Sequence, residues 1–141
     1  MMDKNLKREI IIDHYQYPRN KKSISEALFK IKHRASDSCI DDIKVGMIFD
    51  QGRIIDIKFD GIGCAISTAT TSIFTELLKN KNKEEALKLI DNYLNMLDEK
   101  SYDESLLAEL EAFDELSKQA NRIKCGKIGV LAMKELIEEY E

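Results

Sequence analysis

The sequence predicts an α+β fold in which an antiparallel three-stranded sheet packs against about five helices. Three observations favour this class: alternating apolar and polar residues in the first half of the chain, helical spacing of apolar residues in most of the second half, and one amphipathic stretch ahead of the first strand. Strands followed by helices are typical of a two-layer arrangement. Its 141 residues suffice for one core, so a single domain over residues 1–141 is expected.

The first predicted helix covers about residues 6–17. Leu6, Ile10 and His14 recur there at helical spacing, and Pro18, the only proline, disfavours helix in the residue before it. His14 is expected to be a packed or capping side chain on this helix.

Three strands are predicted from apolar positions that recur at every second residue. The alternating sets are Phe29, Ile31, His33 and Ala35, then Ile43, Val45, Met47 and Phe49, then Ile55, Ile57 and Phe59. His33 is expected to be half-buried on its strand. Gly52 can take the positive φ of a tight turn within residues 50–53, so the last two strands are predicted to form a hairpin.

Helical patterns follow from Ala65 onward. The apolar positions of the four predicted helices are Ile66, Ala69, Ile73 and Leu77, then Leu87, Ile90, Leu94 and Leu97, then Leu106, Leu110, Phe113 and Leu116, and lastly Ile128, Leu131, Ala132 and Leu136. Asn82 and Glu85 have the spacing of a capping box at the second of these helices. The last helix is predicted to begin near Asn121 or Arg122.

Charge and composition exclude several classes of function. The net charge is −4 with 22 basic and 26 acidic residues, so the chain lacks the positive field that nucleic-acid binding requires. No apolar run approaches the roughly 20 residues that cross a bilayer, and basic residues interrupt the N-terminal apolar positions where a signal peptide would lie. The expected location is the cytoplasm, with no membrane and no nucleic acid as partner.

The three cysteines are the residues most informative about function. Cys39 and Asp41 lie at i and i+2, so their side chains leave the same face of an extended chain. Cys64 follows Cys39 by 25 residues, and Cys125 follows Cys64 by 61 residues. Three thiolates and a carboxylate supply the four donors of a tetrahedral zinc or the ligands of an iron-sulfur cluster. Buried, inert thiols are the alternative that the residues alone leave open, because cysteine is among the most buried residue types.

Two of these thiols are predicted to favour the thiolate. Cys64 stands immediately before a predicted helix, whose unpaired amides and positive dipole end lower a thiol pKa. Cys125 is expected in the first turn or so of the last helix, beside Arg122 and Lys124, whose charges act in the same direction.

Four blocks of the chain, in the same order, resemble the NifU/IscU/SufU family of iron-sulfur cluster assembly proteins. They are Ile11-Ile12-Asp13-His14-Tyr15-Gln16-Tyr17-Pro18-Arg19-Asn20, Cys39-Ile40-Asp41, Gly61-Ile62-Gly63-Cys64-Ala65-Ile66-Ser67 and Arg122-Ile123-Lys124-Cys125. The long interval between the second and third cysteines resembles the SufU branch. A fold of the SufE/NifU type is implied.

The resemblance also implies a site and a chemistry. Cys39, Asp41, Cys64 and Cys125 would bind one zinc ion, and Cys39 would accept persulfide sulfur from a pyridoxal-phosphate cysteine desulfurase of the SufS type. Arg122 would lie near the site and stabilise the thiolate. Such a chain is a sulfur carrier or sulfurtransferase that passes sulfur to downstream scaffold or apo-acceptor proteins.

Two alternatives use the same four ligands. One is a scaffold on which a labile [2Fe-2S] or [4Fe-4S] cluster is assembled and transferred, and the other is a structural zinc module whose acidic helix binds a protein partner. The chain also departs from the family pattern, with Ile40 where glycine is usual and Gly126 where alanine is usual. A β-branched residue at position 40 would be strained if that position required positive φ.

Overall fold

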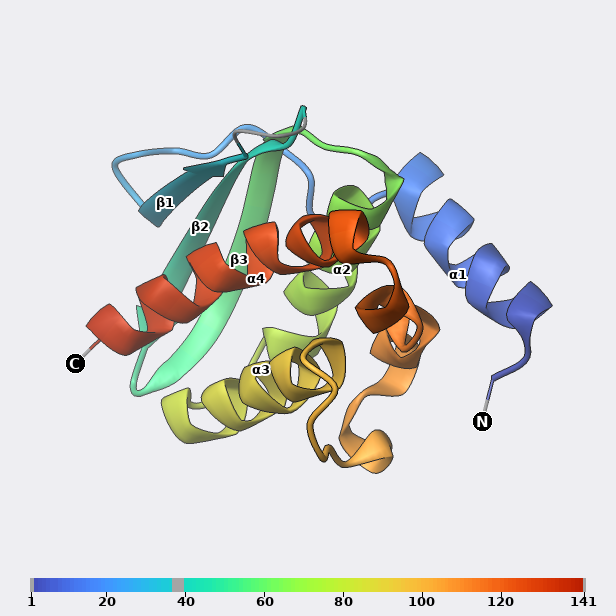
Figure 1. Cartoon of the computed structure of the whole chain (residues 1–141). Coiled ribbons are helices and arrows are strands. Elements are labelled where there is room, and N and C mark those ends of the chain that lie inside the picture. Colours follow the sequence, from blue (N-terminus) through green and yellow to red (C-terminus); the bar gives the residue numbers. More distant parts are fainter. Residues whose placement is uncertain (1, 37–39, 141) are drawn as a thin grey trace.

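The computed structural model describes residues 2–36 and 40–140. Its elements are α1 (Lys4–Gln16), β1 (Lys30–Ala35), β2 (Asp42–Asp50), β3 (Arg53–Ile62), α2 (Ala65–Leu78), α3 (Lys83–Leu97), the short 3₁₀ helices η1 (Glu104–Leu106), η2 (Ala108–Phe113) and η3 (Leu116–Lys118), and α4 (Ala120–Glu139). Figure 1 shows α4 crossing one face of the sheet, with α2 between the sheet and α1. The predicted α+β class is confirmed.

The sheet is antiparallel throughout, in the order β1-β2-β3. Ile43, Val45 and Met47 of β2 are buried beneath the helices, as their alternation predicts. The register of β2 and β3 shifts between Ile48 and Phe49, where Phe49 pairs with Ile54. This bulge buries Ile54 and leaves Ile55 44% exposed, although the sequence pattern had grouped Ile55 with the core.

Strand β1 presents the opposite face from the one its apolar residues suggest. The register places Lys32 beside Val45 and Arg34 beside Ile43, on the side covered by α4. Both cations reach α4, where Lys32 pairs with Glu139 and Arg34 with Glu135. His33 therefore lies on the solvent face with a 54% exposed side chain, paired with Asp42, and is more exposed than predicted.

Helices α2 and α4 approach each other closely at Gly129. A Cβ atom built there would lie 2.0 Å from Thr71 Oγ1 and 3.0 Å from Thr71 Cβ. Only glycine leaves room for this contact, because real Cβ atoms do not come so near another heavy atom. The close approach fixes the distance between the two helices that carry Cys64 and Cys125.

The segment 104–118 differs from the single helix that its apolar spacing predicts. It forms three short 3₁₀ helices, and Ala108 has a positive φ of 50° that interrupts a continuous α-helix. Leu107 is fully buried, whereas Leu106 is 36% exposed. The segment therefore changes direction along its length, so that η2 packs against α1 and η3 packs against α4.

His14 joins α1 to its neighbours and is only 2% exposed. Its Nδ1 lies 2.7 Å from Ser72 Oγ on α2, and its Nε2 lies 3.3 Å from Glu109 Oε1 on η2. The predicted role as a packed histidine accounts for both contacts.

The capping box at α3 is present as predicted, with reciprocal bonds between Asn82 and Glu85 of 2.8 and 3.1 Å.

Replacing Asn82 by alanine is expected to lower the free energy of unfolding by about 1 kcal/mol, because the N-terminal amides of α3 lose their acceptor. Urea denaturation measures this loss. Asn5→Ala, an exposed change inside α1, is the matched control and should leave stability within about 0.5 kcal/mol of wild type.

None of the helices in the described ranges combines the length and apolar character needed to cross a bilayer.

Candidate metal centre

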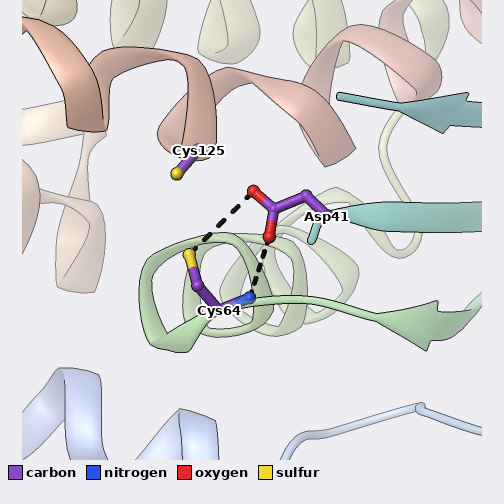
Figure 2. A group of neighbouring side chains, drawn as sticks. All are labelled: Asp41, Cys64 and Cys125. Atoms are coloured by element: carbon purple, nitrogen blue, oxygen red, sulfur yellow. Dashed lines mark hydrogen bonds between the residues drawn. The ribbon is translucent and has the colours of Figure 1, made fainter. Parts of the chain in front are cut away.

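The candidate site lies at the edge of the sheet where β2 begins and β3 ends. Asp41 immediately precedes β2, and Cys64 follows β3 as the N-cap residue of α2. Because Asp42 pairs with Ile62, the hairpin brings these two side chains to the same edge. Cys125 comes from the second turn of α4, which crosses above them (Figure 2). The ligand atoms of the three residues all lie within 4.8 Å of one another.

Asp41 is held firmly in this position and is 1% exposed. Its Oδ1 accepts hydrogen bonds from the Cys64 backbone N–H at 2.8 Å and from Ser67 Oγ at 2.9 Å. Its Oδ2 lies 3.9 Å from Cys64 Sγ, and Figure 2 shows this oxygen on the side of the two sulfur atoms. The carboxylate is therefore fixed before any ion binds.

Cys64 begins α2 as the sequence predicts. Its Sγ accepts a hydrogen bond from the Ser67 backbone N–H at 3.5 Å, the usual bond of an N-cap side chain to the third helical residue. Gly63 makes space for this arrangement, since a Cβ there would lie 2.4 Å from Ser67 Oγ. Ser67 is a site residue that sequence reasoning missed, and its spacing of three from Cys64 was the available signal.

The prediction that Cys125 would favour the thiolate is wrong, because its pKa is raised and not lowered. The residue is 5% exposed, and burial raises the pKa of its thiol, with the adjacent Cys64 and Asp41 raising it further. It lies one turn too far into α4 to meet the unpaired amides, and both Arg122 and Lys124 are exposed to solvent. Burial and negative neighbours outweigh those charges.

Two other predicted site residues, Cys39 and Arg122, are not among these three. Cys39 lies outside the described residues. Arg122 is in the first turn of α4, and within the described residues no hydrogen bond or ion pair joins its guanidinium to Asp41, Cys64 or Cys125. Its role near the site stays a prediction.

The donor set fits a thiophilic cation. Two sulfurs and a carboxylate oxygen are ligands that zinc prefers, and an iron-sulfur cluster also uses thiolate ligands. With both cysteines ionised, two thiolates and a carboxylate this close together would repel one another, and a divalent cation neutralises that repulsion. Cys39 is the predicted fourth donor.

Comparisons with known proteins show which family this chain resembles. The NifU-like N terminal domain model matches residues 6–126. The zinc-dependent sulfurtransferase SufU of Bacillus subtilis (strain 168) is 34% identical over 137 residues, which cover 96% of this chain and 92% of that protein. The iron-sulfur cluster assembly scaffold protein IscU of Thermotoga maritima is 26% identical over 99% of this chain and 97% of its own length.

A solved structure has the same fold. It belongs to a protein of Fervidobacterium islandicum AW-1 that is described as an iron-sulfur cluster assembly scaffold protein for the SUF system, with a TM-score of 0.85 and 31% identity, covering 90% of this chain and 93% of that one. With the family model, the extended SufU likeness and the shared fold in agreement, this chain belongs to the NifU-like N-terminal domain family.

Proposed function

We propose that this protein acts in iron-sulfur cluster assembly as a zinc-dependent sulfurtransferase that accepts persulfide sulfur from a cysteine desulfurase of the SufS type. The observation that carries the proposal is the group of buried Asp41, half-buried Cys64 and buried Cys125, whose ligand atoms lie within 4.8 Å of one another, in a chain that resembles the Bacillus SufU over nearly its whole length. Zinc would be held by these three residues and Cys39, and it would keep thiolates deprotonated at neutral pH.

The transfer step assigns Cys39 as the acceptor. Its thiolate attacks the terminal sulfur of the desulfurase persulfide, a new S–S bond forms on Cys39, and the S–S bond of the desulfurase breaks as its cysteine leaves as a thiolate. No net oxidant is consumed, because sulfane sulfur passes from one thiolate to another. The Cys39 persulfide then serves downstream scaffold or apo-acceptor proteins.

The surface beside the site suits a protein partner. Ile40 and Ile62 are 67% and 64% exposed and flank Asp41 and Gly63, so apolar area is presented at the edge where sulfur would arrive. A desulfurase that covered these two side chains would shield the transferred persulfide from solvent. The predicted cytoplasmic location is where such a partner would be met.

Alanine production by a SufS-type desulfurase, measured with and without this protein, tests the function. We expect stimulation by the wild type and none by Cys39→Ala, together with close to one zinc per chain in gently purified protein. The matched control is Ser36→Ala, three residues before Cys39 in the sequence and not among the predicted ligands. Absence of stimulation by the wild type, or full stimulation by Cys39→Ala, would remove the proposal.

A cluster scaffold is the second candidate, and the likeness to IscU scaffold proteins over almost the entire chain favours it. Reconstitution with iron and sulfide separates the two. A coloured cluster that passes to an apo-acceptor faster than free iron and sulfide supports the scaffold, whereas colourless protein that retains its zinc supports the sulfurtransferase.

A further inference from the structure

We infer that Ser67 is a positioning residue, which fixes the Asp41 carboxylate so that Oδ2 is the oxygen presented to the metal. The inference rests on the proposed metal site and adds to it a residue outside the predicted ligand set. Ser67 is 0% exposed and lies on α2, one turn after Cys64.

The hydroxyl of Ser67 has several neighbours, and their distances identify its main partner. It lies 2.9 Å from Asp41 Oδ1, but 3.3 Å from the Cys64 carbonyl oxygen and 3.6 Å from Cys64 Sγ. The shortest contact is thus with the carboxylate. A hydrogen bond from a buried hydroxyl to a charged acceptor is also stronger than one to a neutral carbonyl.

This bond makes the two carboxylate oxygens of Asp41 unequal. Among the described residues, the Ser67 hydroxyl and the Cys64 backbone N–H donate hydrogen bonds to Oδ1, whereas Oδ2 is turned towards the sulfurs of Cys64 and Cys125 (Figure 2). Both donors belong to the start of α2, so the orientation of Asp41 is tied to the position of Cys64. The carboxylate would therefore bind through one oxygen and would be a firmly held ligand.

Hydrogen bonds of this kind orient the ligands of metal sites and affect their affinity. Removing such a partner typically lowers metal affinity by about 10–100-fold. The effect arises because the unrestrained ligand must be ordered when the metal binds and can adopt a different coordination mode. The geometry at Asp41 predicts a loss in this range for Ser67→Ala.

The test compares zinc affinity in Ser67→Ala and Ser72→Ala by competition with a chromophoric chelator. Ser72 is the matched control: it is also buried on α2, but its hydroxyl contacts His14 Nδ1 at 2.7 Å and the Arg19 amide at 2.8 Å, away from the site. We expect weaker zinc binding by about 10–100-fold in Ser67→Ala only. Ser67→Thr, which keeps a hydroxyl, should recover part of the loss.

A spectroscopic measurement separates positioning from a general loss of structure. The d–d absorption of the Co²⁺-substituted protein reports the ligand geometry, and it should change in Ser67→Ala while remaining that of wild type in Ser72→Ala. If Ser67→Ala and wild type had equal zinc affinity and equal Co²⁺ spectra, the role of Ser67 would be overturned and the proposed function would stand. A wild-type protein that binds no zinc would instead remove the proposed function on which it rests.

Discussion

Replacing Cys125 by serine is expected to abolish tight zinc binding. A serine hydroxyl does not ionise at neutral pH and is a poor zinc ligand, and among the described residues no other cysteine, histidine or acidic side chain joins Asp41 and Cys64 in this group. Loss of a direct ligand should exceed the roughly 10–100-fold effect of losing a supporting hydrogen bond. Chelator competition and elemental analysis measure the change.

The same variant distinguishes a functional site from an inert thiol in the core. Without zinc, Cys125→Ser should unfold at nearly the wild-type temperature, because the side chains are similar in size. With zinc, only the wild type should gain thermal stability, since binding to the folded state stabilises it by mass action. A serine variant that retained one zinc at wild-type affinity would show that Cys125 is not a ligand.

Gly129→Ala is expected to destabilise the fold by about 3 kcal/mol, the upper end of the usual cost of overpacking. The new methyl would lie 2.0 Å from Thr71 Oγ1, so α2 and α4 would have to separate. The better helix propensity of alanine, worth about 1 kcal/mol, offsets only part of this cost. Urea denaturation measures the stability, and zinc affinity should fall as well because these helices carry Cys64 and Cys125.

Two further variants control the interpretation. At Gly126, on the same helix, the nearest atom to a new Cβ is Cδ1 of Leu116 at 2.8 Å, the far end of a side chain that can change rotamer, so Gly126→Ala should cost much less. Thr71→Ala removes the clashing Oγ1, and the double variant with Gly129→Ala should be more stable than the two single effects added together. Additive losses would show that the α2–α4 contact is not the cause.

Much of the fold could be predicted because local signals agree with it. The Asn82 capping box, the turn at Gly52 and the alternation in β2 are properties of neighbouring residues, and each is found where predicted. Which face of β1 meets the helices could not be predicted. Its apolar positions could cover the core, but so could its basic positions, because the aliphatic stems of lysine and arginine pack on apolar surface. Only the pairing with β2 and the acidic residues of α4 decide it.

The site was predictable in its parts but not in its electrostatics. The hairpin implies that Asp41 and Cys64 meet, and the helix after β3 places Cys64 at an N-terminus. The depth of Cys125 depends on how α4 packs against α2, which no local pattern encodes, so the rise in its pKa was missed. Ser67 was overlooked because a buried serine near a helix start commonly bonds only to its own helix.

The placement of Cys125 on α4 also bears on the timing of maturation during synthesis. A nascent chain that has completed the sheet and α2 already orients Asp41 and Cys64, yet it lacks the helix that supplies the sulfur from above. Such an intermediate would lack one of the four donors of the proposed site. Under the proposed function, complete metal coordination would therefore require a chain in which α4 has folded onto the sheet and α2.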